Sequence, residues 1–297
     1  MDGLQVSAPA MIPRSAYKSL TPERRGAFNV ARAQHHMGGL SVHTTAVADI
    51  ERLLLPSRDR GGRVVVVDGP PRSGKSWSVM RSAARFETCV RTHSAAPASE
   101  RSVPVVYASV GTAKSSPDAA GAVAQFLGMS VTPRGSRGGL VGNVCDELVR
   151  AGTRVVVLDD AHMLSGCGNE AAELVHKIAG VADVCVVVIG LGLPDGAFHF
   201  DSGFTQTQLR TWRTSMTGCE GTAGDEWRGI VAQLESQLRL YEHVPGTLTA
   251  GCCGLLHRWT GGSIADLVGL VGAAAVDVVG SGSEAITTDV LERLCSS

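Results

Sequence analysis

Aromatic residues and net charge are both scarce in this chain of 297 residues. Only 4% of its residues are aromatic, while 44% are hydrophobic and 36 are glycines, so the sequence predicts a mainly aliphatic core. The formal net charge is -1, which excludes the global basic field that many nucleic-acid-binding proteins carry, although a local basic patch is compatible with it. With 19% charged residues, the composition is that of a folded protein rather than a disordered one.

The sequence also lacks the signatures of metal clusters, secretion and membrane spans. Its eight cysteines form no CxxC pair and no Cys/His group at metal-binding spacing. Cys145, Cys185 and Cys252 lie in apolar runs, where cysteine acts as a small buried hydrophobe. The N-terminus shows no charged region followed by an apolar stretch, and no apolar run approaches ~20 residues. We therefore expect a cytoplasmic protein with reduced thiols and no membrane partner.

Three segments follow from the pattern along the chain. Residues 1–40 predict an N-terminal helical segment, with a helix over 22–34 that Thr21 caps. Residues 41–222 alternate apolar runs with amphipathic stretches, which is typical of an α/β core. Residues 223–297 predict only helices and form a small helical appendage.

The central segment predicts a parallel sheet with helices on both faces. Continuous β-branched or apolar runs indicate strands that are buried on both sides. Amphipathic stretches between these runs supply the crossover helices of βαβ units. The predicted strands cover residues 64–67, 103–109, 154–158 and 184–189. The predicted helices cover residues 76–86, 117–127 with Ser116 as cap, 140–151 after a flexible link at 135–139, and 169–179.

A phosphate-binding loop follows the first predicted strand. Its sequence, Gly69-Pro70-Pro71-Arg72-Ser73-Gly74-Lys75-Ser76, fits the pattern G-x-x-x-x-G-K-[ST] between a strand and a helix. The glycines let successive N–H groups form an anion nest at the helix N-terminus. Lys75 can reach the β- and γ-phosphates, and the Ser76 hydroxyl can ligate magnesium. The whole loop, together with Trp77 after it, is the predicted binding site for ATP and Mg2+; the alternative is a chance glycine-rich turn.

Paired carboxylates end the third predicted strand. Asp159 is expected to hold Mg2+, directly or through water, and Asp160 to orient the attacking water. Most related ATPases have Glu at the second position, and the shorter Asp predicts slow hydrolysis rather than none. The alternative is that both aspartates only cap the following turn.

Four segments of the chain resemble the AAA+ ATPases of transposition, the TniB/TnsC group. The motifs are Ser19-Leu20-Thr21-Pro22-Glu23-Arg24, the nucleotide motifs ending in Asp159-Asp160-Ala161-His162, Gln208-Leu209-Arg210-Thr211-Trp212-Arg213, and His257-Arg258-Trp259-Thr260-Gly261-Gly262-Ser263-Ile264. The resemblance implies an AAA+/ASCE core with a C-terminal helical lid. Relatives of this kind form rings or helical filaments on double-stranded DNA and recruit or activate a DDE-type transposase.

The same resemblance implies a site completed by a neighbouring subunit. Arg210 and Arg213 are the candidate arginine fingers, and three residues apart on a helix they would share a face. The alternative is that both are solvated surface arginines. DNA phosphates would be contacted by basic residues near the N-terminus and in the flexible link. These candidates are Arg24, Arg25, Arg32, Arg134 and Arg137.

Two departures from the family indicate weak catalysis. Gly190-Leu191-Gly192 offers no polar side chain where a sensor residue often lies, and the helix near Ser263 lacks the usual second-sensor arginine. The sequence therefore predicts a slow ATPase that regulates transposition, with ATP acting as an assembly clamp. Two other interpretations stay open: a nucleotide-gated AAA+ or STAND-like signalling protein without DNA contact, and an origin-recognition-like loader.

Overall fold

The computed structural model describes residues 8–58, 61–93, 102–130, 137–167, 169–193, 210–216, 219 and 224–295. The chain divides into two compact units, Thr45–Met216 and Met1–Thr44 together with Thr217–Ser297. The N-terminal helical segment that the sequence separates from the rest thus packs with the C-terminal helices in one unit.

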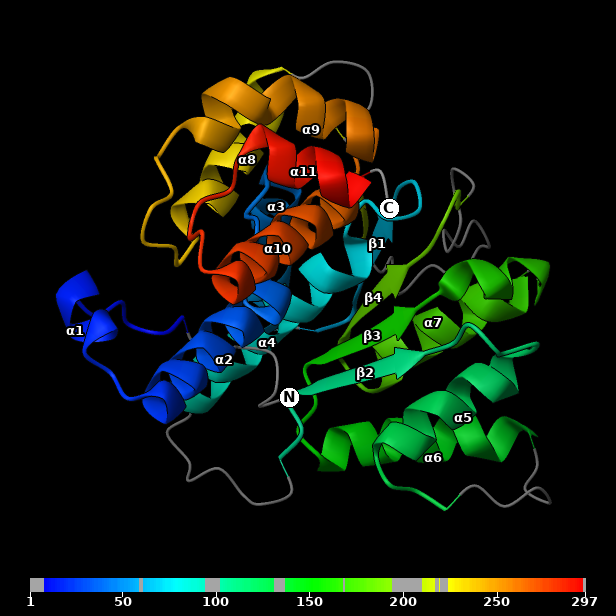
Figure 1. Cartoon of the computed structure of the whole chain (residues 1–297). Helices are drawn as coiled ribbons and strands as arrows, with labels where there is room; N and C mark the ends of the chain where they lie inside the picture. Colours follow the sequence, from blue (N-terminus) through cyan, green and yellow to red (C-terminus); the bar gives the residue numbers. More distant parts are fainter. Residues whose placement is uncertain are drawn as a thin grey trace. The chain divides into compact units, whose positions relative to one another are not determined.

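A five-stranded parallel sheet forms the centre of the Thr45–Met216 unit (Figure 1). Its strands lie in the order β2-β3-β4-β1-β5. The strands are β1 (Arg63–Asp68), β2 (Val105–Ser109), β3 (Val155–Asp159), β4 (Cys185–Ile189) and β5 (Arg210–Ser215). The first four match the predicted runs within a few residues, because consecutive valines are buried on both faces of the sheet.

Helices cover both faces of this sheet, as the sequence predicts. Val64 and Val66 of β1 pack into one apolar cluster with α5 (Ser116–Phe126), α6 (Arg137–Arg150) and α7 (Asn169–Val181). Val65 and Val67 point the other way and pack with α3 (Thr45–Leu54) and α4 (Lys75–His93). The alternation of side chains along a strand thus supplies both cores at once. Short 3-10 turns, η1 (Leu55–Arg58) and η2 (Ala161–Cys167), follow α3 and β3.

Several predicted boundaries in this unit were wrong. The N-cap of α5 is Ser115, whose Oγ accepts from the Asp118 N–H, and not Ser116. Residues 137–139, predicted as part of a flexible link, instead begin α6, although glycine is a weak helix former. The helix after the P-loop runs on to His93, because its later turns are stabilised by local pairs such as Arg91 with Glu87.

The other unit is entirely helical in its described part. It contains α1 (Arg14–Lys18), α2 (Pro22–Gly38), α8 (Asp225–Ser236), the π-helical turn η3 (Thr247–Cys252), α9 (Cys253–Thr260), α10 (Ile264–Ser281) and α11 (Thr288–Cys295). Thr21 caps α2 as predicted, but the helix includes His35 and His36 instead of ending before them. Both imidazoles bond to the loop after α8, which favours a longer helix.

Helix α10 is the centre of this helical unit. It packs closely on α2: a Cβ added at Gly272 would lie 2.5 Å from the His36 carbonyl oxygen. By length and composition alone, α10 is the one helix in the described residues that is long and apolar enough to cross a membrane, a test that core helices also pass. Its buried residues, among them Leu267, Val271 and Val278, belong to the core of this unit.

The predicted buried thiols are also confirmed. Cys145, Cys185 and Cys252 are all buried, and the seven cysteines whose side chains the structure describes are free thiols.

Candidate functional site

The phosphate-binding loop connects β1 to α4 at the carboxyl edge of the sheet. Gly69 has a φ of 151°, and a Cβ at this position would lie 2.2 Å from the Met216 carbonyl oxygen. Gly74 has a φ of 85°, in the left-handed region that L-residues disfavour. Both glycines of the motif are therefore required by the backbone itself. Arg72, with a φ of 62°, supplies a third left-handed position between them.

Lys75 lies inside this loop. Its ammonium donates to the carbonyl oxygens of Gly69, at 2.8 Å, and Pro70, at 2.5 Å, and lies 3.5 Å from Ser73 Oγ. Burial lowers the pKa of Lys75, while the negative charges of nearby aspartates oppose that shift. A buried cation surrounded by a curled backbone fits an anionic ligand, because a phosphate can replace the carbonyl groups as its partner. Pro71 and Arg72 are exposed, and Trp77 is half-buried under the Arg81 guanidinium.

Ser76 and Asp159 come together as the two nucleotide motifs require. Ser76 Oγ donates to Asp159 Oδ1 at 3.0 Å, and the Asp160 N–H donates to the same oxygen at 2.8 Å. A hydroxyl and a buried carboxylate side by side form an oxygen donor set that suits a hard divalent cation. Tyr107, which sequence reasoning missed, donates to the other oxygen, Oδ2, at 2.5 Å. The available signal was a lone tyrosine in the strand beside β3.

Asp160 begins the turn after β3 in the left-handed region, with a φ of 60°. Aspartate tolerates this conformation better than most residues, which gives a local reason for the shorter acid at this position. Its carboxylate lies against Gly111, where an added Cβ would come within 3.3 Å of Oδ2. Ser109 Oγ is 3.5 Å from the same oxygen. The two aspartates of the motif thus have separate surroundings.

The predicted arrangement of Arg210 and Arg213 was wrong. Both lie in strand β5 and not in a helix, so the helical spacing on which the shared face was predicted is absent. The segment reads Arg-Thr-Trp-Arg-Thr-Ser and, within the described residues, pairs with β1 alone, so it is a polar edge strand without an apolar run. Arg213 forms an ion pair of 2.7 Å with Asp68 of its own chain and also donates to the Leu193 carbonyl. The side chain of Arg210 lies outside the described residues.

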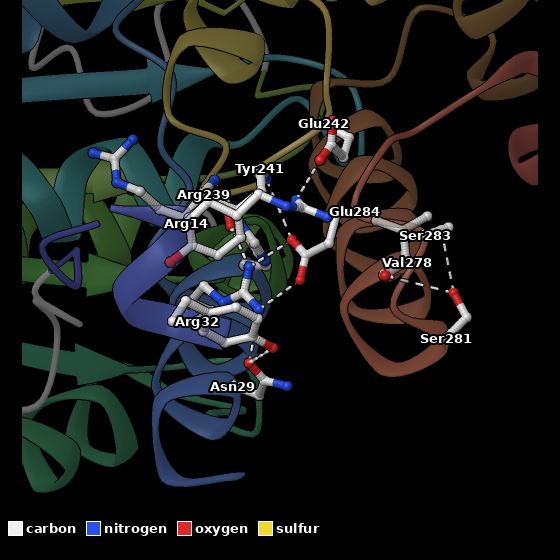
Figure 2. Close-up of polar contacts among 12 residues, drawn as sticks. Arg14, Asn29, Arg32, Arg239, Tyr241, Glu242, Val278, Ser281, Ser283 and Glu284 are labelled. Carbon is white, nitrogen blue, oxygen red and sulfur yellow. Dashed lines mark hydrogen bonds and ion pairs between the residues drawn. The ribbon is translucent and has the colours of Figure 1, made fainter. Parts of the chain in front are cut away.

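One predicted DNA contact, Arg32, is also contradicted. Its guanidinium is fully buried and forms a bidentate ion pair with Glu284, at 2.7 and 2.8 Å (Figure 2). Arg25 donates to the carbonyl oxygens of Lys18 and Leu20, whereas Arg24 is exposed. Arg134 and the side chain of Arg137 lie outside the described residues. Of the three N-terminal candidates, Arg32 therefore cannot reach DNA phosphates, and Arg24 is the exposed one.

Comparisons with known proteins agree with this fold. Residues 58–192 match a family described as AAA domain. No curated protein sequence matches the chain. Among solved structures, the ORC2 protein of Aeropyrum pernix, in its ADPNP-ADP complexes, is similar with a TM-score of 0.60 and 14% identity over 84% of this chain and 66% of that one.

Two further solved structures show the same likeness. Drosophila ORC bound to DNA has a TM-score of 0.58 and 14% identity, over 97% of this chain and 69% of that one. Cdc6p from Pyrobaculum aerophilum has a TM-score of 0.51 and 15% identity, over 94% of this chain and 69% of that one. The protein thus spans about two thirds of the length of these chains. Its fold is that of the AAA+ P-loop ATPases: residues 58–192 match the AAA domain family, and the C-terminal region is helical.

Proposed function

We propose that the protein binds ATP with Mg2+, hydrolyses it slowly, and uses the bound state to assemble with copies of itself on double-stranded DNA. The observation that carries the nucleotide part is the 3.0 Å hydrogen bond between Ser76 and Asp159. It joins the hydroxyl of one motif to the carboxylate of the other, 83 residues later, beside a buried lysine. This combination is what nucleotide binding by P-loop proteins requires.

Each residue of the site has a role in this proposal. Gly69 to Ser76 cradle the phosphates, and Lys75 binds the β- and γ-phosphate oxygens. Ser76 and Asp159 hold Mg2+, which when bound neutralises charge on the phosphates. Asp160 orients the attacking water, and its short side chain accounts for slow turnover. Trp77 flanks the loop on α4. Arg210 remains a proposed arginine finger for a neighbouring subunit.

The first experiment tests the nucleotide site. Lys75→Ala removes the cation that binds the phosphates, so binding of a fluorescent ATP analogue should fall by at least about 100-fold. Asp160→Asn should retain binding and lower turnover, which traps the assembled state. Unchanged turnover in Asp160→Asn would show that another group orients the water. Unchanged binding in Lys75→Ala would overturn the nucleotide part of the proposal.

We further propose that the DNA-bound assembly regulates transposition by recruiting or activating a DDE-type transposase. The support is the resemblance of four segments to the TniB/TnsC group and the similarity of the fold to ORC bound to DNA. Electron microscopy with a slowly hydrolysed ATP analogue, with and without duplex DNA, tests the assembly. Rings or filaments that need both ligands support it, and monomers under every condition contradict it. Assembly that needs the ATP analogue but is the same with and without DNA favours a nucleotide-gated signalling protein without DNA contact.

An origin-recognition-like loader is the second candidate, and the solved ORC and Cdc6p structures favour it. The two candidates differ in how they should bind DNA. Phosphate contacts alone give salt-dependent binding that is nearly independent of sequence, as expected for assembly on many target sites. A loader that marks a fixed site should prefer one sequence. Binding to random duplexes, followed by selection of the bound fraction, distinguishes them.

A further inference from the structure

The last residue of β1, Asp68, directly precedes the P-loop and is bound by side-chain and main-chain groups of two other chain segments. Arg213 Nη2 donates to Asp68 Oδ2 at 2.7 Å, and the Leu193 N–H donates to Oδ1 at 3.2 Å. The same Arg213 nitrogen donates to the Leu193 carbonyl. Three chain segments therefore meet here: the end of β1, the turn after β4, and β5. The main chain strengthens the junction, since the Met216 N–H donates to the Asp68 carbonyl at 2.7 Å.

The charge of Asp68 matters because this carboxylate precedes the first glycine of the loop. Together with Asp159 and Asp160, it acts electrostatically on Lys75. Burial on its own raises the pKa of Asp68, but the hydrogen bonds from Arg213 and from the backbone outweigh that effect and hold the pKa below its ordinary value. Asp68 therefore stays ionised, and Arg213 is the guanidinium that pairs with it. Without Arg213, the charge of Asp68 would be left without this cation directly before the first glycine of the phosphate-binding loop.

The Asp68–Arg213 pair also binds the turn after β4. Gly190, Leu191 and Gly192 carry no polar side chain, so this turn cannot bond to a ligand through a side chain. Its next residue, Leu193, is bound through both its N–H and its carbonyl to the Asp68–Arg213 pair. The pair thus connects the turn to the P-loop where a sensor side chain is missing.

We propose that Arg213 is a positioning residue of its own chain: it neutralises Asp68 and connects the turn after β4 to the P-loop, so that the site accepts the γ-phosphate. This inference rests on the proposed nucleotide function. It differs from the arginine-finger interpretation, in which Arg213 would leave its own chain to act on a neighbour's nucleotide. If Arg213 is a positioning residue, its removal weakens the affinity of a chain for its own ATP. If Arg213 is a finger, its removal leaves that affinity unchanged.

The test compares Kd values for fluorescent ATP and ADP analogues in a set of full-length variants. Arg213→Met should weaken ATP binding about 10-fold, as expected for one charge-assisted contact, and ADP binding much less, because ADP has no γ-phosphate. Asp68→Asn removes the charge that needs neutralising, so the double variant Asp68→Asn/Arg213→Met should bind ATP nearly as the wild type does. Arg213→Lys should restore part of the ATP preference. Asp68→Asn and Arg213→Lys keep the test valid if Arg213→Met fails to fold.

A matched control removes an arginine from a solvent-exposed pair in the same unit. Arg52 pairs with Asp49 on α3 with its side chain 75% exposed, and Arg52→Met should leave the ATP-to-ADP ratio unchanged. A purely structural role for Arg213 would weaken both nucleotides equally and would overturn the inference.

A mixing experiment distinguishes this positioning role of Arg213 from that of an arginine finger. If Arg213 acts on a neighbour, mixing Arg213→Met with Lys75→Ala protomers should restore turnover, since one supplies the nucleotide site and the other the arginine. The inference predicts no such rescue. Wild-type protein that binds neither nucleotide would overturn the proposed function, and this inference with it. Wild-type binding with an unchanged ATP-to-ADP ratio in Arg213→Met would overturn the inference alone.

Discussion

The Tyr107 hydroxyl donates a hydrogen bond of 2.5 Å to Oδ2 of Asp159. The two residues lie on adjacent strands, β2 and β3, and Ser76 bonds to the other oxygen of the same carboxylate. Burial and the hydrogen bond to Asp159 raise the pKa of Tyr107, so the phenol stays protonated and remains a donor. Asp159 is thus fixed from both sides, by the P-loop on one and by the neighbouring strand on the other.

Replacing Tyr107 with phenylalanine should therefore disturb the proposed metal site without removing a metal ligand. A hydrogen bond to a charged group is worth about 1.5–3 kcal/mol, so the Mg2+ concentration for half-maximal ATP turnover should rise roughly 10- to 100-fold. A titration of turnover against Mg2+ at saturating ATP measures this shift.

Tyr17→Phe is the matched control for this change. Its hydroxyl donates to Asn29 Oδ1 at 3.0 Å in the helical unit, so the same atom is lost far from any proposed metal ligand in sequence. The Mg2+ requirement should stay at the wild-type value. Equal effects of the two substitutions would mean that Tyr107 contributes only to stability.

Gly69→Ala should prevent the P-loop from forming its native conformation. The added Cβ would lie 2.2 Å from the Met216 carbonyl oxygen, a backbone atom that cannot move aside without breaking the contact between β1 and β5. We expect ATP binding to be lost, as measured by fluorescence titration, and the thermal midpoint of unfolding to fall.

Gly121→Ala makes the same substitution where the structure has room. Nothing lies within 4 Å of a Cβ at Gly121, in the middle of α5, and alanine favours a helix by about 1 kcal/mol over glycine. This variant should be slightly more stable than the wild type and bind ATP normally. A normal P-loop in Gly69→Ala would show that the backbone there adapts.

The strands that are buried on both faces of the sheet could be predicted from the sequence, whereas the edge strand β5 could not. Consecutive valines such as Val155 to Val157 are buried on both faces, and such a run is recognisable in any sequence. Within the described part of the chain strand β5 pairs with β1 alone, and its sequence Arg-Thr-Trp-Arg-Thr-Ser has no apolar run that distinguishes a strand from a helix. Only the pairing with β1 decides between the two, and pairing is not visible in local sequence.

The residues of the candidate site likewise fall into those that a local motif predicts and those that only contacts between distant segments bring in. Lys75, Ser76 and Asp159 follow from motifs whose spacing is fixed by a strand and a loop. Tyr107 and Asp68 join the site through contacts between strands, 52 and 145 residues apart in sequence from their partners Asp159 and Arg213. The predicted DNA contact of Arg32 was wrong for the same reason, because its partner Glu284 is 252 residues away in sequence.

The Arg32–Glu284 pair should be a large contributor to the stability of the helical unit. Both side chains are buried, and the Arg32 guanidinium lies 5.3 Å from the ring centroids of Tyr17, Phe28 and Tyr241. Arg32→Met leaves the Glu284 carboxylate buried without its cation, which should cost about 3–5 kcal/mol in the free energy of unfolding. Urea denaturation measures this loss.

The double variant Arg32→Met/Glu284→Gln separates the charge from the packing. With the carboxylate also removed, much of the stability should return, because the cost of an uncompensated buried charge disappears. If the double variant is as unstable as Arg32→Met, the aromatic contacts of the guanidinium, and not its ion pair, hold this region together.

His36 should make the helical unit unstable in mild acid. Burial, followed by the charges of His35, Arg32 and Arg239, lowers the pKa of His36 from 6.5 to about 4, and its Nε2 accepts a hydrogen bond from the Arg239 N–H. In the unfolded chain His36 binds a proton below pH 6.5, while in the folded protein it stays neutral to about pH 4. The unfolded state therefore binds more protons in this window, so stability falls as the pH drops from 6.5 toward 4.

The expected loss across this window is about 3 kcal/mol, from 1.36 kcal/mol for each pH unit. Urea denaturation at pH 7, 5.5 and 4.5 measures it, and His36→Gln should flatten the curve because glutamine has no proton to bind. Glu235 is a second group that can lower stability in acid. Burial raises its pKa, but its hydrogen bonds to Thr249, Leu248 and His243 outweigh burial and lower the pKa below 4.5, so protonation of Glu235 reduces stability only below pH 4.5. A loss that begins only below pH 4.5, or one that persists in His36→Gln, would assign the acid sensitivity to carboxylates rather than to His36.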